Sequence, residues 1–285
     1  MREEKPDNID WGLAPLHEKM LEILKYIDEF CGTYRIGYFL LAGTALGAIR
    51  HGGFIPWDDD ADVTMTVEDY ERFRVLFNEH GDKERFYLQE MNRYGGMLTM
   101  PKLRMNGTTL IEENYRESDI HQGIYVDIFL LHGAPPTYTG KKLSVFALNY
   151  IIIKRLSNNH YNRRKAFMPI LAALRLFPKD FLIRTCLKRI YKYGTDDADV
   201  LFDTGAFVKS MYPARDIFYP IKRIPFEGIC LCVPHKAEEY LEALYGDWKA
   251  LPDVESIRRA QHAALWDAEK DFREYAPNVR DFSDE

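Results

Sequence analysis

The stretch LLAGTALGAIRHGGFIPWDDDADVTM, residues 40–65, decides the prediction, because it sets four acidic residues between apolar flanks. On an extended chain alternate side chains share a face, so Asp58, Asp60 and Asp62 point one way and Asp59 points the other. Three carboxylates on one face repel each other unless a cation lies between them. Oxygen ligands select a hard ion. The sequence therefore predicts a site for Mg²⁺ or Mn²⁺.

Two other interpretations compete for this acidic run. An acidic surface turn would have the same composition, although the apolar residues 54–57 and 63–65 favour burial of its flanks. A calcium loop fails, because Val63 stands where that loop needs glycine and Asp69 where it needs a glutamate. The surface turn is the alternative that stays open.

A second acidic position lies far along the chain. The run GIYVDIFLL, residues 123–131, is nearly all apolar, which is typical of a strand buried on both faces. Asp127 is its single charged residue, and an ionised carboxylate there is costly without a metal ion or a partner. We expect Asp127 to be a metal-site carboxylate or general base; the alternative is a buried acceptor for backbone amides.

Groups that can bind a phosphate accompany the acids: Gly43, Thr44, Arg50, Lys102 and Arg104. The glycine and threonine would let backbone amides approach an anion at the start of a helix. Lys102 and Arg104 share one face of a predicted strand. We expect these groups, with Asp58, to form a substrate-binding set for a phosphate chain.

Composition excludes several classes of protein. The 285 residues carry 38 Lys and Arg against 44 Asp and Glu, a net charge of −6, which argues against a dedicated nucleic-acid binder. No apolar run approaches the ~18 residues of a membrane-spanning helix. The N-terminus has no apolar signal core, so we expect a cytoplasmic protein. The cysteines and histidines show neither a disulfide framework nor zinc-binding spacing.

Helical and extended patterns alternate along the chain. Helices are expected over residues 13–31, 45–50, 67–80, 235–245 and 255–275, and strands over 36–41, 100–105, 124–131, 207–212 and 228–233. This pattern predicts an α+β fold. The expected organisation is a catalytic core over 10–135, a basic helical insertion over 136–200, and residues 201–285 completing the core and adding a terminal helix.

The insertion has an unusual charge. Residues 141–192 hold 13 Lys and Arg against one Asp, and their apolar residues recur at roughly helical spacing. A basic amphipathic segment favours an anionic surface, either lipid or a phosphate-rich glycan. The alternative is a solvated helical subdomain. Nucleic acid is less favoured, because no known binding motif accompanies the charge.

The sequence resembles a known family in four segments: residues 40–65, KLRMNGTTLIEEN (102–114), GIYVDIFLL (123–131) and FEGICLCVPHKAEEYLEALYGDWKALPD (226–253). These segments are similar to the blocks of the LicD/fukutin-like phosphotransferases. The resemblance covers about residues 10–253, without the basic insertion. It implies a nucleotidyltransferase-like fold, with a short mixed sheet flanked by helices.

The resemblance also implies roles for particular residues. Gly43 and Thr44 match the turn that contacts phosphate, Asp60 and Asp62 the metal-binding pair, and Asp127 the third carboxylate. Members of the family transfer phosphocholine from CDP-choline, or a polyol phosphate from a CDP-polyol, to sugar hydroxyls.

We therefore expect a metal-dependent phosphocholine transferase that releases CMP and acts on a cell-surface glycan, such as lipopolysaccharide or teichoic acid. The alternatives are a ribitol or glycerol phosphate transferase, a nucleotidyltransferase that uses CTP, and a non-catalytic metal-binding scaffold. The expected partners are a CDP-linked donor and a glycan acceptor, lipid-linked or free. Peripheral contact with the inner face of a membrane through residues 141–192 is also expected.

Overall fold

The computed structural model describes residues 5–90, 100–116, 118–144, 146–147, 185–189, 191–195, 198–203 and 214–276. Its helices include η1 (Pro6–Asn8), α1 (Ala14–Tyr34), α2 (Ala42–Arg50), α3 (Val67–His80), η3 (Glu113–Tyr115), α7 (Arg215–Phe218), α8 (Ala237–Tyr245), α9 (Val254–Ala260) and η5 (Phe272–Glu274). Its strands include β1 (Phe39–Leu40), β2 (Asp62–Thr66), β3 (Phe86–Gln89), β4 (Lys102–Met105), β5 (Thr109–Glu112), β6 (Tyr125–Gly133), β7 (Leu201–Asp203), β8 (Lys222–Phe226), β9 (Ile229–Val233) and β10 (Ala263–Asp267). No helix in this described part is long and apolar enough to span a membrane.

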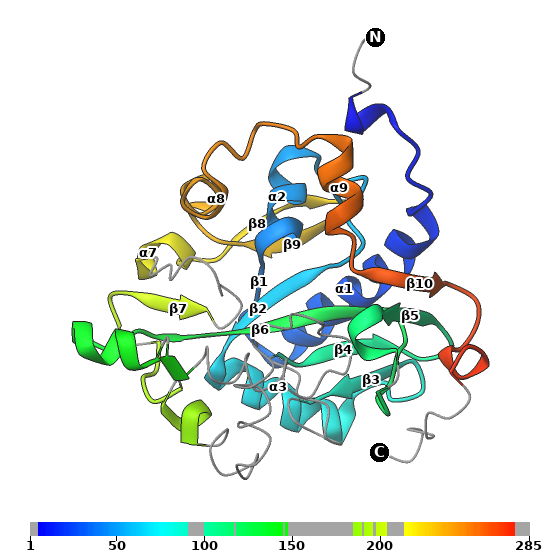
Figure 1. Ribbon diagram of the computed structural model, residues 1–285. Helices are drawn as coiled ribbons and strands as arrows, with labels where there is room; N and C mark the ends of the chain where they lie inside the picture. Colours follow the sequence, from blue (N-terminus) through cyan, green and yellow to red (C-terminus); the bar gives the residue numbers. More distant parts are fainter. Residues whose placement is uncertain are drawn as a thin grey trace, which may run out of the picture.

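A mixed sheet with the strand order β1-β2-β6-β4-β3 forms the centre of the molecule (Figure 1). β2 and β6 are parallel, and the other neighbours along this path are antiparallel. The short strand β7 pairs with the end of β6. Helices and strands both pack on this sheet, so the predicted α+β class is confirmed.

Helices α1 and α3 cover one face of the sheet. Both contact β6, and Phe30 of α1 meets Phe73 of α3 edge-on, with ring centroids 5.3 Å apart. The predicted apolar stripe of α1 is fully buried at Leu16, Met20, Ile23, Leu24 and Ile27. Burying such a stripe provides most of the stability of a helix in a folded protein.

Local signals fix α3 where the sequence predicts it. The hydroxyl of Thr66 accepts a hydrogen bond from the backbone amide of Asp69, 2.9 Å away, which caps the first turn. Every residue of β6 is buried, as expected for a strand covered on both faces. Contacts of β9 with β1, and of α8 with α2, join the C-terminal residues to the core.

Two expectations about local structure are wrong. The chain does not form one helix over 255–275: α9 ends at Ala260, and β10 pairs with β5. There, long-range partners outweigh the helical pattern. The helix expected from residue 45 begins instead at Ala42, so Gly43 and Thr44 lie inside its first turn.

Part of the predicted insertion lies outside the described residues. Residues 138–144 and 185–189 are helical, whereas residues 148–184 and the strand expected at 207–212 fall outside the described part. The role predicted for the basic segment therefore stays a prediction.

Candidate active site

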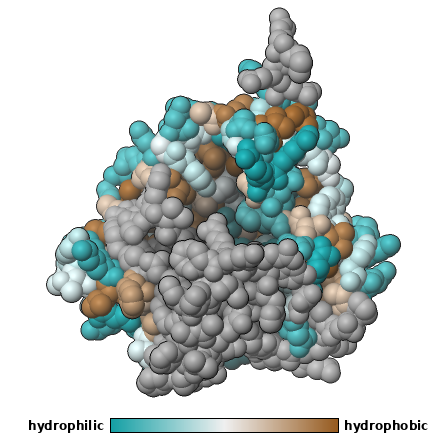
Figure 2. Space-filling view, viewed as in Figure 1, coloured by the Kyte–Doolittle hydropathy of each residue, from teal (hydrophilic) through white to brown (hydrophobic). Residues whose placement is uncertain are grey.

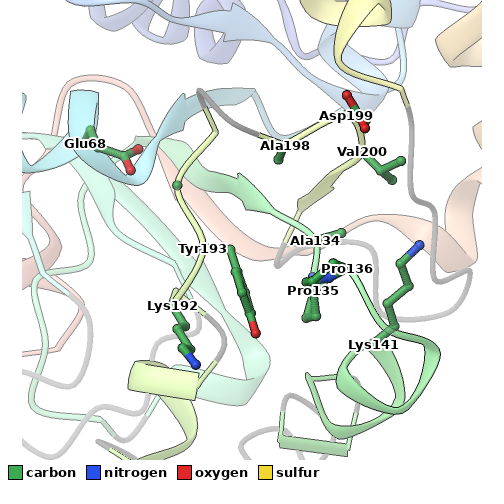
Figure 3. Close-up of a pocket in the computed structure, with 11 residues that line it drawn as sticks. Glu68, Ala134, Pro135, Pro136, Lys141, Lys192, Tyr193, Ala198, Asp199 and Val200 are labelled. Carbon is green, nitrogen blue, oxygen red and sulfur yellow. The ribbon is translucent and has the colours of Figure 1, made fainter.

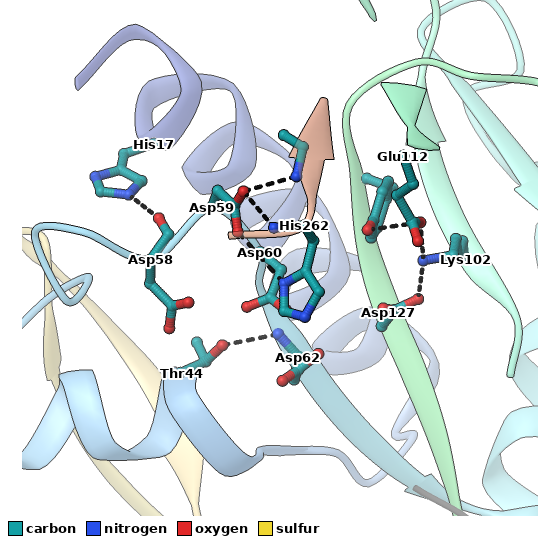
Figure 4. Close-up of polar contacts among 12 residues, drawn as sticks. His17, Thr44, Asp58, Asp59, Asp60, Asp62, Lys102, Glu112, Asp127 and His262 are labelled. Atoms are coloured by element: carbon teal, nitrogen blue, oxygen red, sulfur yellow. Dashed lines mark hydrogen bonds and ion pairs between the residues drawn. The ribbon is translucent and has the colours of Figure 1, made fainter. Parts of the chain in front are cut away.

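Acidic residues from two separate stretches of the chain meet in the central sheet. Asp62 on β2 and Asp127 on β6 are partners in the parallel register, and Lys102 on β4 is the partner of Asp127 on its other side. The ammonium Nζ of Lys102 lies 2.8 Å from Asp127 Oδ1 and 3.3 Å from Glu112 Oε1 (Figure 4). One row across three strands thus holds two carboxylates and a cation, with a third carboxylate from β5 beside it.

Burial and repulsion shift the protonation of these acids. The pKa of Asp62 is raised well above its usual range, because the group is buried and because Asp60 and Asp127 are close. Burial also raises the pKa of Asp127 to about 6, with the charge of Lys102 opposing the shift. The site is therefore a place where a further positive charge would be stabilised.

Asp58 lies at the start of α2. A Cβ added to Gly43 would lie 2.6 Å from Asp58 Oδ2, so glycine lets the carboxylate approach the helix this closely and a larger residue would displace it. Burial and the neighbouring Asp60 raise the pKa of Asp58 well above its usual range. Ala42, just before, has φ of 44°, in the left-handed region that non-glycine residues rarely adopt. In this structure, the anion at the helix start is a carboxylate of the chain itself.

Thr44 joins α2 to the acidic strand. Its hydroxyl oxygen accepts a hydrogen bond of 2.7 Å from the backbone amide of Asp62, and its side chain is buried. The start of the helix and the start of β2 are therefore held in one geometry. The structure thus gives Thr44 a positioning contact within the predicted phosphate-binding turn.

Asp59 is directed to the start of β10, but it does not face opposite to Asp60 as the alternation predicts, because both carboxylates contact His262. Asp59 Oδ2 accepts hydrogen bonds from the backbone amides of His262 (2.8 Å) and Ala263 (2.7 Å), at the start of β10. The imidazole Nδ1 of His262 lies 3.3 Å from Asp59 Oδ1 and 3.2 Å from Asp60 Oδ2. Hydrogen bonds to these two carboxylates raise the pKa of His262 to about 11, so the imidazole is a cation at neutral pH.

The two predicted arginines do not meet the acidic cluster. Arg50 is at the end of α2, where it donates to the carbonyl of Trp248 at 3.0 Å. Arg104 is fully buried, donates to Gln89 and to the carbonyl of Gly123, and stacks on Tyr125. Lys102 is directed to carboxylates, so none of the three predicted cations is placed as a ready phosphate clamp.

Three side chains of the site were not predicted: Glu112, Tyr245 and His262. Glu112 lies in the segment 102–114, as the last residue of β5. An acid at the end of a strand is the sequence feature that could have revealed it. Partial burial, together with the charges of Asp62, Asp58 and Asp60, raises the pKa of Tyr245, a residue that is 44% exposed, so its hydroxyl lies within electrostatic range of the cluster. His262 is 203 residues from Asp59, and no local pattern marks it.

The described residues contain no ready-made group of three or more His, Cys, Asp or Glu side chains that could hold a metal ion. Two contacts explain this arrangement: Asp127 is paired with Lys102, and Asp60 is paired with His262. The mutual repulsion of Asp58, Asp60 and Asp62 is nevertheless the charge pattern that a hard divalent cation relieves. These carboxylates therefore supply oxygen ligands of the kind such an ion prefers, although in the described residues they are not gathered around one point.

A separate cavity of about 600 Å³ lies at the other end of β6 (Figure 3). Its lining combines prolines, two lysines and two acids: Glu68, Ala134, Pro135, Pro136, Lys141, Lys192, Tyr193, Gly194, Ala198, Asp199 and Val200. Ala134 is seven residues beyond Asp127, a span of roughly 23 Å along a strand. The cavity is therefore distinct from the acidic cluster.

Comparison with known proteins identifies the family. Residues 35–143 match the family described as LicD/FKTN/FKRP, nucleotidyltransferase domain. The chain is also 32% identical over 253 residues to the lipopolysaccharide cholinephosphotransferase LicD of Haemophilus influenzae, covering 82% of this chain and 90% of that protein. The chain belongs to the LicD family.

Two further proteins match shorter parts of the chain. An uncharacterised protein of Rickettsia typhi is 38% identical over 57 residues, covering 20% of this chain and 18% of its own. An uncharacterised protein of Rickettsia prowazekii is 28% identical over 113 residues, covering 40% of this chain and 33% of its own. The LicD match of residues 35–143 includes the acidic run, Lys102, Glu112 and Asp127.

Proposed function

We propose that this chain transfers phosphocholine from CDP-choline to a hydroxyl of a cell-surface glycan and releases CMP, in a reaction that needs Mg²⁺ or Mn²⁺. The observation that supports this most is the pairing of Asp62 with Asp127 beside the acidic run. The Haemophilus relative is named for lipopolysaccharide and phosphocholine. A lipopolysaccharide-like glycan is therefore the first acceptor to test.

The acidic run would hold the divalent ion. Asp60 and Asp62 are the proposed ligands, with Asp127 completing the site, and oxygen ligands suit Mg²⁺ or Mn²⁺. When bound, the ion would neutralise charge that develops on the phosphates of the donor. The hydrophilic residues that gather over α9, in the segment leading to His262, fit a charged substrate on this face (Figure 2).

The chain's own residues have separate tasks in this proposal. The acceptor hydroxyl oxygen forms a new bond to the phosphorus of phosphocholine, the bond from that phosphorus to CMP breaks, and CMP leaves with the electron pair. Asp127 is the proposed acceptor of the hydroxyl proton, since it is ionised above about pH 6. Lys102 holds the Asp127 carboxylate in place at 2.8 Å.

A screen of donors tests the proposal. Purified protein is incubated with Mg²⁺ or Mn²⁺ and, in separate reactions, CDP-choline, CDP-ribitol, CDP-glycerol or CTP, with and without a glycan acceptor. We expect CMP from CDP-choline, dependent on acceptor and lost on chelation with EDTA. CMP from a CDP-polyol alone would overturn the assignment of the donor, and pyrophosphate from CTP would overturn the reaction class.

A further inference from the structure

The C-terminal segment is tied to the acidic run by one carboxylate. Asp59 accepts from the amides of His262 and Ala263, and its side chain is 4% exposed. Because these are backbone amides, any residue except proline at position 262 could make the first of these bonds. The pairing of β10 with β5 holds the same segment from its other side. Anchoring of the segment therefore does not depend on the imidazole.

The imidazole makes a different contact. Its Nδ1 lies between Asp59 Oδ1 and Asp60 Oδ2, at 3.3 Å and 3.2 Å. Within the described residues, His262 is the cationic side chain that is ion-paired with Asp60. Figure 4 shows its ring beside Asp59 and Asp60, on the side of these residues that faces Asp127 and Lys102. Two cations therefore contact different members of the acidic cluster: Lys102 pairs with Asp127, and His262 contacts Asp60.

We propose that His262 is a positioning residue of the active site: its Nδ1–H fixes the carboxylate of Asp60, and Asp59 holds the imidazole in place. This inference rests on the proposed transfer reaction, in which Asp60 is essential. A carboxylate that is already oriented stabilises the transition state more than a mobile one does, because it does not have to reorganise as the reaction occurs. Removal of an outer partner of this kind typically costs about 10- to 100-fold in activity.

Three substitutions at this position separate orientation from folding. In His262→Ala we expect kcat for CMP release to fall ~30-fold, with KM for the donor within about threefold and Tm within ~2 °C. In His262→Asn the side-chain amide takes the place of Nδ1–H, so kcat recovers to within ~5-fold of the parent. In His262→Gln the amide falls nearer to Nε2, so no recovery is expected. Gln261→Ala, an exposed neighbour, is the matched control and stays at parental activity.

The outcomes are distinguishable from failure of the proposed function. If the parent protein releases no CMP from any CDP-alcohol, the transfer reaction itself is wrong. If the parent is active and His262→Ala keeps full kcat, the positioning role is wrong. A loss of Tm shared by all three variants, or equal recovery in the Asn and Gln variants, also overturns it.

Discussion

The two ends of strand β6 differ in how their charged groups are arranged. Near its start, Asp127 meets Asp62 and Lys102 in one charged row. Beyond its last residue, the chain forms the Pro135–Pro136 wall of the cavity and the helical residues 138–144. In open parallel sheets, ligand sites gather at the carboxyl ends of strands, which would favour the cavity end. Here the acidic groups lie instead at the start of β6, beside α2 and β10. The position of the site therefore depends on the segments around the sheet and not on strand direction alone.

Removing one carboxylate of the charged end should have the largest effect. We expect Asp62→Asn to lower CMP release about 10³-fold, because an essential electrostatic group is lost. Its Tm, measured without added divalent ions, should rise by ~2 °C, since a buried like charge disappears. Glu79→Gln, on the exposed end of α3, serves as the control. If Asp62→Asn instead fails to fold, Asp62 has a structural role, and the loss of activity would not show that this end of β6 is the functional one.

The pH dependence of stability and of transfer is a second test of the charged end of β6, through Asp127. Since the pKa of Asp127 is about 6 in the fold and its ordinary value is 3.8, the folded chain binds this proton more tightly. The stabilising contribution of the group is therefore present below about pH 4 and is lost as pH rises through about 6. Urea unfolding across this range should show the slope in the parent and not in Asp127→Asn. Transfer should fall roughly tenfold per pH unit below about pH 6. A flat rate profile would exclude Asp127 as the base.

Neutralising the buried cation tests whether the charged row is a stability element. Lys102 has a side chain only 5% exposed, so Lys102→Met leaves Asp127 beside Glu112 without its cation. We expect a loss of about 3 kcal/mol in the free energy of unfolding. Lys142→Met, at the cavity end, should change it by less than ~0.5 kcal/mol. If urea titrations show the same loss of unfolding free energy in Lys102→Met and Lys142→Met, the buried Lys102–Asp127 pair is not a special stability element of the charged end.

The smallest effect is expected at the cavity end. Tyr138 and Phe146 are more than 70% exposed, and Lys142 lies 4.5 Å over the Tyr138 ring. Exposed aromatic groups beside lysines suit an anionic lipid surface. We expect Tyr138→Ser with Phe146→Ser to weaken sedimentation with phosphatidylglycerol vesicles about threefold. Val75→Ser on α3 should have no effect, and transfer to a water-soluble acceptor should stay at parental rate. Unchanged sedimentation would remove the membrane contact.

The sequence predicted those parts of the site that depend on local pattern. The lone acid in an apolar run gave Asp127 a buried place on β6, whereas the alternation along residues 58–62 did not separate Asp59 from Asp60, which both contact His262. The sequence could not give the partners of Lys102, because the register of β4 with β6 and the position of β5, which pairs with β10, depend on long-range contacts. Arg104 shares the strand face of Lys102, yet it is bonded to neutral groups. His262 was missed because the sequence pattern predicts one helix over 255–275. In the structure α9 ends at Ala260 and β10 pairs with β5, a long-range contact that local pattern does not reveal.

The bond from Asp59 to the amide of Ala263 joins positions 204 residues apart. During synthesis, residues 58–62 leave the ribosome long before this partner exists. If chains grow at about 5–20 residues per second, the acidic run waits on the order of ten seconds or more for its C-terminal anchor. A nascent chain can therefore build the central sheet but cannot complete the neighbourhood of Asp60.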